Sequence, residues 1–344
     1  MENEISSPVL RNVSLKQVNT FGLVAEAAFF CRVDTVQGAR EALLFARQQG
    51  LETLILGGGS NILFTRDFPG LVIQVDCRGY RLLEETASAF RIRAGAGQPW
   101  HEFVMACLEK GWYGLENLSL IPGTTGAAPM QNIGAYGAEV REFIDRVHYL
   151  NLDTLQEESL SAGECAFGYR DSVFKNSLRA KVLIWSVDFL LLRQPAVRTG
   201  YGDIQRVLEE KGISSPSPRD VSDAVVAIRS AKLPDPALTG NAGSFFKNPL
   251  IRKDHFRRLS DRFPEIPFYP AGPDSVKIPA GWLIERAGWK GHNRGTHGVH
   301  DRQALVLVNY GGATGAEILL LSRDIQADIQ ARYGIELQAE VNVV

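Results

Sequence analysis

Two segments rich in small residues most constrain how this chain folds. Residues 114–139 read GLENLSLIPGTTGAAPMQNIGAYGAE, and residues 56–63 read LGGGSNIL. Small side chains let the backbone approach a bound molecule closely, and such loops present free N–H groups that suit an anion such as pyrophosphate. The shorter segment follows an apolar run at residues 53–56, which predicts a strand followed by a loop. Together the two segments favour one extended ligand with a charged middle.

Neither segment is a standard nucleotide-binding motif. The glycines of LGGGSN lack the GxGxxG spacing, and GxxxxGK[ST] does not occur in the chain. Glycine supplies 33 of the 344 residues, which is about 10% of the chain, whereas glycine usually makes up ~7% of a protein. On composition alone, two purely structural turns are therefore an equally good interpretation.

Composition and charge exclude several classes of function. The net charge of −2 argues against general nucleic-acid binding. Residues 219–302 nevertheless hold 14 Lys and Arg against 9 Asp and Glu, which favours an anionic substrate in that region. The four cysteines form no CxxC pair, so no metal site or disulfide framework is expected. The acidic N-terminus and the lack of a long apolar run favour a cytoplasmic protein.

The pattern of apolar residues predicts an α+β fold with few βαβ units. Residues 212–219, GISSPSPR, are the best candidate for a linker. Strands are expected at 53–56, 71–75, 90–94, 146–152, 181–192, 305–308 and 335–344, and helices at 38–49, 100–110, 221–231, 252–263, 281–287 and 315–333.

Four further segments carry candidate functional side chains, each with a structural alternative. FGYRDSVFK holds Arg170, which is more commonly a surface ion-pair partner, and TGYGDI is a turn that displays Tyr201. Lys232, in RSAKLPDP, also fits a simple role at a helix C-terminus. Ser244, in GNAGSFFKNP, lies beside glycine as turn-forming serines do, and no GxSxG motif surrounds it.

As a set, five of these segments resemble the UDP-N-acetylenolpyruvoylglucosamine reductase family of bacterial peptidoglycan synthesis. They are LGGGSNIL, the 114–139 stretch, GYRDSVFK, KLPDP and GNAGSFFKNP. The resemblance runs from NTFG at Asn19 to Glu340. It implies a two-part FAD-binding unit of the vanillyl-alcohol oxidase (PCMH) type, with FAD between the two parts, and a smaller α+β substrate-binding domain. The corresponding ranges are 1–70 and 71–219 for the FAD-binding parts and 220–334 for the substrate domain, with residues 335–344 able to return to the flavin side.

The resemblance also implies ligands and residue roles. FAD is bound noncovalently and NADPH is the reductant. The cofactor-binding positions are Gly57, Gly58, Gly59, Ser60, Asn61, Pro122, Gly123, Thr124, Gly126, Ala127, Gln131, Asn132 and Gly134. The substrate-binding positions are Tyr201, Lys232, Asn248 and Gln303, and the catalytic ones are Arg170, Ser244 and Glu340. A glycine precedes the tyrosine in RTGYGDI, which leaves open whether Tyr201 keeps the position of the family's lid tyrosine.

The implied reaction is that of a UDP-N-acetylmuramate dehydrogenase acting on UDP-N-acetylglucosamine enolpyruvate. A hydride adds to the terminal alkene carbon and a proton to the carbon that bears the carboxylate. Arg170 and Glu340 are expected to stabilise the charge that develops on the carboxyl group. A glutamate can do so only if it is protonated or positions a cation. Ser244 is expected to donate the proton, activated by Lys247 or by a water chain.

Two alternative functions are weighed against this one. The first is an oxidase of the same fold that passes electrons to oxygen; many such oxidases tether FAD through a histidine in the first glycine-rich loop, which LGGGSN lacks. The second is a non-catalytic module that binds flavin or a UDP-sugar, and the presence of Arg170, Ser244 and Glu340 together speaks against it. The expected oligomeric state is a monomer, although the sequence does not determine it.

Overall fold

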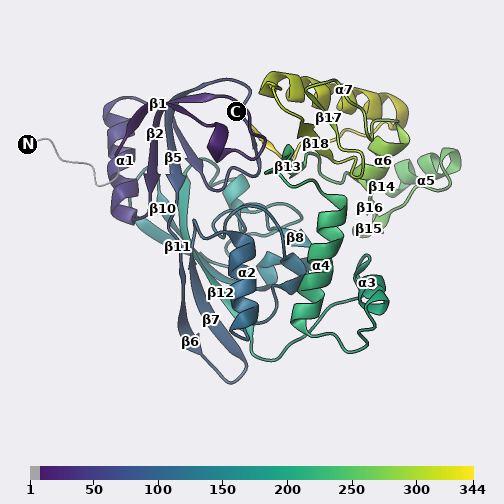
Figure 1. Ribbon diagram of the computed structural model, residues 1–344, viewed down its shortest axis with the longest axis horizontal. Coiled ribbons are helices and arrows are strands. Elements are labelled where there is room, and N and C mark those ends of the chain that lie inside the picture. Colours follow the sequence, from purple (N-terminus) through teal and green to yellow (C-terminus); the bar gives the residue numbers. More distant parts are fainter. Residues whose placement is uncertain (1–7) are drawn as a thin grey trace, which may run out of the picture. The chain divides into compact units, whose positions relative to one another are not determined.

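The structure, a computed structural model, describes residues 8–344, so part of the N-terminal stretch considered above lies outside the described residues. The chain forms two compact units (Figure 1). The first contains the residues up to Val13, Ala27–Gly58 and Phe68–Ala231, and the second contains Ser14–Glu26, Gly59–Asp67 and Lys232–Val344. The chain therefore passes more than once between the two units.

A small, mostly parallel sheet begins the first unit. Its strands lie in the order β1 (Leu10–Ser14), β2 (Glu26–Val33), β5 (Phe68–Val75) and β3 (Thr53–Leu56). Strand β5 runs parallel to both β2 and β3. Helix α1 (Val36–Gln48) connects β2 to β3 and begins where the Thr35 hydroxyl accepts a hydrogen bond from the Gly38 N–H.

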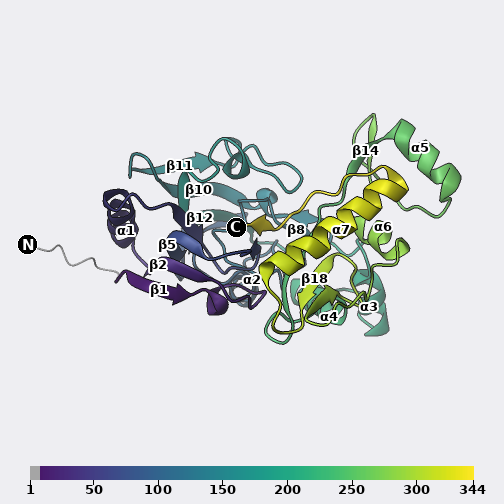
Figure 2. The same ribbon diagram turned by 90° about the horizontal axis from the view of Figure 1, so that it is seen from above.

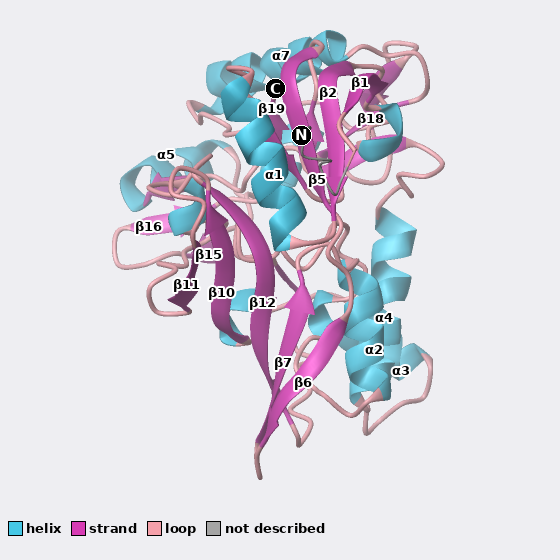
Figure 3. Ribbon diagram, turned by 90° about the vertical axis from the view of Figure 1, so that its left-hand side faces the viewer, coloured by secondary structure: helices cyan, strands magenta, loops and turns pink. Residues whose placement is uncertain are grey.

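A five-stranded antiparallel sheet forms the larger part of the first unit (Figure 3). Its strands lie in the order β11 (Glu157–Ser161), β10 (Ile144–Asn151), β12 (Val182–Leu192), β7 (Ala89–Gly95) and β6 (Tyr80–Glu85). Helix α2 (Trp100–Glu109) packs on the sheet through Phe103, whose ring centroid lies 5.1 Å from that of Phe189 on β12. This contact belongs to the apolar core of the unit.

The long 114–139 stretch contains little regular structure. It holds the 3₁₀ turn η2 (Glu116–Leu118) and the two-residue strands β8 (Gly134–Ala135) and β9 (Ala138–Glu139). The turns η3 (Val140–Glu142) and η4 (Val173–Lys175) follow. Helices α3 (Ile204–Glu210) and α4 (Pro218–Lys232) share a separate apolar cluster that includes Leu208 and Val225.

The second unit contains two three-stranded sheets and a two-stranded pair. The first sheet has the order β13 (Gly240–Ser244), β18 (Val306–Asn309) and β17 (His297–Val299), and the second has β14 (Leu250–Arg252), β16 (Ser275–Lys277) and β15 (Tyr269–Pro270). Strand β19 (Asn342–Val343) pairs with β4 (Ile62–Leu63). The helices are the 3₁₀ turn η1 (Lys16–Val18), α5 (Lys253–Arg262), α6 (Ala280–Arg286) and α7 (Gly315–Tyr333).

Helix α7 organises the core of the second unit. It lies beside β18 (Figure 2) and contacts both β17 and β18. Its buried residues include Ile318, Leu321, Ile325 and Ile329. A capping box of Thr314 and Glu317 begins the helix, and Gly334, with a φ of 64°, follows its last residue. Among residues 8–344, no helix combines the length and apolar character that crossing a membrane requires.

The predicted helices and the longer strands are confirmed, most of them to within a few residues at each end. We expected irregular chain with one short strand in the first 35 residues, but the described part of this region contains both β1 and the eight-residue strand β2. The predicted terminal strand at 335–344 is wrong in length, since only Asn342–Val343 forms a strand, and Ala339 forms an isolated bridge with Phe246. Several short strands, such as β13 and β16, were not predicted because segments of three to five residues show no clear alternation.

Candidate active site

The two glycine-rich loops meet within the first unit. Strand β3 ends at Leu56, and Gly57 and Gly58 then run past the second loop. A Cβ atom on Gly58 would lie 3.3 Å from the Cα of Gly123, and one on Gly57 would lie 3.0 Å from the Thr124 hydroxyl oxygen. Side chains at these two positions would crowd the second loop, so the glycines allow this close approach.

The meeting point of the loops presents unpaired backbone donors. Within the described part of the chain, the N–H groups of Gly57, Gly58, Gly123 and Thr124 donate to no protein acceptor. Four such donors on two adjacent loops form a suitable cradle for an anion such as a diphosphate. This arrangement fits FAD, the cofactor that the family resemblance implies at these loops.

The other predicted cofactor-binding residues lie along the same two loops. Gly126 packs so closely on Ala96 that a Cβ atom would overlap with it, and its N–H donates to the Ala96 carbonyl. A side chain on Gly59 would collide with the carbonyl of Val18. Ser60, Asn61, Pro122, Ala127 and Gln131 occupy turns or irregular chain.

Arg170 lies against the end of the second loop. Its guanidinium donates to the carbonyl of Asn132 at 3.3 Å and to that of Gly134 at 2.5 Å. Asn132 is itself fully buried and donates to the carbonyl of Gly168 and to the carboxylate of Glu139. The structure therefore brings Arg170 next to Asn132 and Gly134, which lie 38 and 36 residues before it in the sequence.

Tyr201 lies on an exposed turn of the first unit. Its side chain is 48% exposed, and a Cβ atom on Gly137 would lie 3.4 Å from the Tyr201 Cβ. The neighbouring Gly202 makes a similar approach to the Tyr136 ring. The glycines of the TGYGDI turn and of the GAYG segment thus let two tyrosine-bearing turns pack against each other.

Ser244 and Glu340 belong to neighbouring segments of the second unit. Ser244 ends β13 opposite Val306, after a β-bulge, and is followed by the buried Phe245. The backbone N–H of Glu340 donates to the Phe245 carbonyl at 2.8 Å. The Asn61 side chain donates in turn to the Glu340 carbonyl at 3.3 Å. Glu340 is therefore held by docked chain on two sides, even though it lies near the C-terminus.

The three remaining predicted substrate residues also lie in the second unit. Lys232 is exposed at the last position of α4. The Asn248 side-chain oxygen accepts a hydrogen bond from the N–H of Ala280 at the start of α6. The Gln303 side-chain oxygen accepts one from the N–H of Leu305, at 3.3 Å. Asn248 and Gln303 each keep their amide NH₂ as a donor for a further partner.

Sequence reasoning missed several charged side chains around the 114–139 stretch. Burial raises the pKa of Glu116, which is 1% exposed and accepts a hydrogen bond from the Gly114 N–H. Burial, together with the nearby charge of Arg170, lowers the pKa of Arg229. Arg229 lies in the RSAKLPDP segment, in which only Lys232 had been singled out. The sequence signal for this residue was its place in the motif, because Arg229 lies about one helical turn before Lys232.

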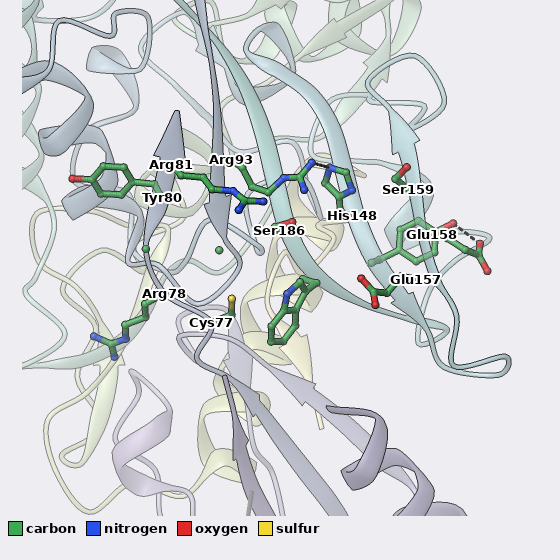
Figure 4. A pocket seen from close by; sticks show the side chains of 14 residues that line it. Cys77, Arg78, Tyr80, Arg81, Arg93, His148, Glu157, Glu158, Ser159 and Ser186 are labelled. Atoms are coloured by element: carbon green, nitrogen blue, oxygen red, sulfur yellow. Dashed lines mark hydrogen bonds between the residues drawn. The ribbon is translucent and has the colours of Figure 1, made fainter. Parts of the chain in front are cut away.

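A separate groove of about 740 Å³ crosses one face of the antiparallel sheet (Figure 4). Arg93, His148 and Trp185 line it, and none of the predicted site residues does. Next to it, the buried Asp188 accepts hydrogen bonds from two nitrogens of Arg93, at 2.6 and 2.8 Å. His148 also contacts Asp188, at 3.0 Å. This network satisfies a buried carboxylate on a polar sheet face.

Comparisons with known proteins agree with this geometry. Residues 27–156 match the family model for an FAD binding domain, and residues 235–344 match that for the C-terminal domain of UDP-N-acetylenolpyruvoylglucosamine reductase. The reductase of that name from Chromobacterium violaceum is 51% identical over 96% of this chain and 97% of its own length.

Two solved structures share the fold. The crystal structure of UDP-N-acetylenolpyruvylglucosamine reductase from Thermus caldophilus has a TM-score of 0.68 and 22% identity, and covers 98% of this chain and 99% of its own. The 6-hydroxy-D-nicotine oxidase of Arthrobacter nicotinovorans has a TM-score of 0.50 and 13% identity, and covers 98% and 88%.

The matched FAD binding domain and the shared fold define an FAD-binding α+β protein with the fold of the vanillyl-alcohol oxidase (PCMH) type. Within that class, the family is shown by the 51% identity to the Chromobacterium violaceum reductase over 96% of this chain. The chain belongs to the UDP-N-acetylenolpyruvoylglucosamine reductase family.

Proposed function

We propose that this protein is a cytoplasmic, FAD-dependent reductase that converts UDP-N-acetylglucosamine enolpyruvate to UDP-N-acetylmuramate with NADPH. The observation that carries the proposal is the 51% identity to a reductase of this name over 96% of the chain. The excess of positive charge at residues 219–302 supports an anionic, nucleotide-linked substrate. The product belongs to the synthesis of peptidoglycan precursors.

The two glycine-rich loops are proposed to hold the cofactor. The unpaired N–H groups of Gly57, Gly58, Gly123 and Thr124 suit its diphosphate. FAD, when bound, supplies a hydride acceptor and donor between NADPH and the substrate. LGGGSN contains no histidine, which supports noncovalent binding.

Arg170 and Glu340 are proposed to stabilise the charge that develops on the substrate carboxyl group. The Arg170 guanidinium is permanently charged, and its contacts with the carbonyls of Asn132 and Gly134 fix its orientation. Such preorganisation is what makes an electrostatic group effective in catalysis. Glu340 takes part as a protonated acid or as the partner of a cation, because a bare carboxylate would repel the developing charge.

Ser244 is proposed to donate the proton to the carbon that bears the carboxylate. The bulge at the end of β13 and the buried Phe245 fix the backbone at this position. Tyr201, Lys232, Asn248 and Gln303 are proposed to bind the substrate. Lys232 offers a point charge for the diphosphate, and the exposed turn of Tyr201 suits a loop that closes over bound substrate.

Anaerobic spectroscopy of the purified protein tests the proposal. NADPH should bleach the flavin absorbance, and the enolpyruvyl substrate should then restore it without oxygen. An oxidase of the same fold would instead be reoxidised rapidly by air and not by this substrate. A non-catalytic binding module would show no bleaching by NADPH, and either result would overturn the proposal.

A further inference from the structure

Side chains from two helices hold three consecutive residues of the second glycine-rich loop, which lie shortly before Gly123. The indole of Trp100 on α2 donates to the Leu118 carbonyl at 2.8 Å. The hydroxyl of Ser222 on α4 lies 2.7 Å from that of Ser119, and both serines are fully buried. Leu120 is held on both of its backbone groups, as described next.

Leu120 is the most constrained of the three. Its N–H donates to Nδ1 of His101 at 3.1 Å, and its carbonyl accepts from Nε of Arg229 at 3.2 Å. Its φ of 57° lies in the left-handed region, which an L side chain disfavours. The two hydrogen bonds therefore oppose relaxation of the backbone to an ordinary conformation.

The protonation states of the two side chains match these roles. Nδ1 of His101 accepts a hydrogen bond only when that nitrogen carries no proton. Burial first, and then the charges of Arg229 and Arg219, lower the pKa of His101. The guanidinium of Arg229 is a permanent donor. A neutral acceptor and a charged donor thus hold the two successive peptide groups on either side of the Leu120 Cα.

The constraint reaches the proposed diphosphate cradle within three residues. Gly123, three positions after Leu120, accepts a hydrogen bond at its carbonyl from the Trp100 N–H at 3.0 Å. The N–H groups of Gly123 and Thr124 donate to no protein acceptor in the described chain. The first turn of α2 therefore holds the 118–124 segment at both of its ends.

We propose that His101 and Arg229 are positioning residues, which hold the 118–124 segment in the conformation that presents the Gly123 and Thr124 N–H groups to the diphosphate of FAD. Ser222 supports them through Ser119. The proposal rests on the proposed function, because it assumes that this loop binds FAD. Neither His101 nor Arg229 has to touch the cofactor in this role.

The rate of FAD release from the holoprotein, followed by the rise of flavin fluorescence on dilution, tests the proposal. His101→Leu should release FAD about tenfold faster, the effect of losing one hydrogen bond to the part-buried N–H of Leu120. His101→Asn should restore most of the wild-type rate, because the asparagine oxygen takes nearly the position of Nδ1. His255→Leu is a matched control, since His255 also contacts a backbone group, the Tyr333 carbonyl, at 3.0 Å.

A double mutant shows whether the effect passes through the loop. Gly123→Ala should itself speed release, because the φ of Gly123 is 110° and alanine cannot adopt it without strain. Adding His101→Leu should then change the rate by much less than tenfold. Additive effects, no rescue by asparagine, or an equal effect of His255→Leu would overturn the positioning role. If Gly123→Ala leaves release unchanged, the assignment of the loop to FAD fails instead.

Discussion

Four non-glycine residues with positive φ angles lie in or beside the second glycine-rich loop of the first unit. They are Leu120, Asn132, Tyr136 and Arg170, with φ between 45° and 57°. Each such residue costs roughly 1–2 kcal/mol relative to a right-handed conformation. Such conformations concentrate at functional sites, where the surrounding structure maintains them. Here the carbonyls that Arg170 contacts and the side chains that hold Leu120 supply that support.

At the residue scale, Ser244→Ala should separate the two half-reactions. Reduction of the flavin by NADPH needs no proton from Ser244, so bleaching should keep its wild-type rate. Reoxidation by the enolpyruvyl substrate should slow by roughly 10²–10⁴-fold, the range for a lost general acid. Anaerobic stopped-flow absorbance measures the two rates separately. Equal slowing of both rates would assign Ser244 to shaping the flavin site, and no slowing would remove it from the mechanism.

Asp188 should contribute stability that disappears in acid. Hydrogen bonds from Arg93 and His148 lower its pKa from 3.8 to about 2, against the opposing effect of burial. A carboxyl group with a lowered folded-state pKa stabilises the fold above its unfolded pKa, and this contribution is lost as the pH falls from about 4 to about 2. The shift corresponds to about 2 kcal/mol at neutral pH.

Asp188→Asn should therefore lower the free energy of unfolding by about 2 kcal/mol at pH 7 and by much less near pH 2. Denaturant titrations of both proteins across this pH range measure the difference. Asp153→Asn, at an exposed position, serves as the control and should change little at any pH. A constant difference between wild type and Asp188→Asn across the range would contradict the assignment.

At the scale of elements, the pairing of β19 with β4 connects the C-terminus to the first glycine-rich loop. Asn342 and Val343 pair with Ile62 and Leu63, which directly follow LGGGSN. The Val344 carbonyl also accepts a hydrogen bond from the Thr65 N–H. The strand pair thus helps to fix the position of Glu340, which lies two residues before β19.

Removing residues 341–344 should therefore weaken FAD binding as well as substrate reduction. The deletion leaves Glu340 in place but removes the strand that holds both this residue and the chain after the loop. The dissociation constant of FAD and the rate of substrate reduction should both change. Glu340→Gln, which keeps the strand, should slow substrate reduction while FAD binding stays near wild type. Full activity of the truncated protein would contradict this account of β19.

For the whole molecule, FAD should stabilise the folded state by binding to it alone. At a free FAD concentration 100 times the dissociation constant, the expected stabilisation is about 2.7 kcal/mol. The purified protein should be yellow, release FAD on denaturation, and unfold at a higher temperature with FAD than without it. Flavin that stays with the precipitated chain would contradict noncovalent binding, and a colourless protein that FAD cannot reconstitute would contradict binding altogether.

Helices and strands that have a clear apolar periodicity could be predicted from the amino-acid sequence alone. The strand at Thr53–Leu56, the helix at Gly315–Tyr333 and the long strand at Val182–Leu192 are evident from apolar periodicity and capping residues. The two glycine-rich loops are also evident from the sequence, because small residues are concentrated in these two segments. The family resemblance rested on these same loops and on short motifs.

Only the tertiary structure decided which distant residues lie together. The close approach of Gly58 to Gly123 joins two loops that are far apart in the chain. The hydrogen bond from Arg170 to the Asn132 carbonyl likewise joins distant segments. The hydrogen bonds of His101 and Arg229 to Leu120 join two helices to the backbone of one residue and leave no local pattern. Periodicity reports which face of an element is buried, whereas the partner across that face is selected by the packing of the complete chain.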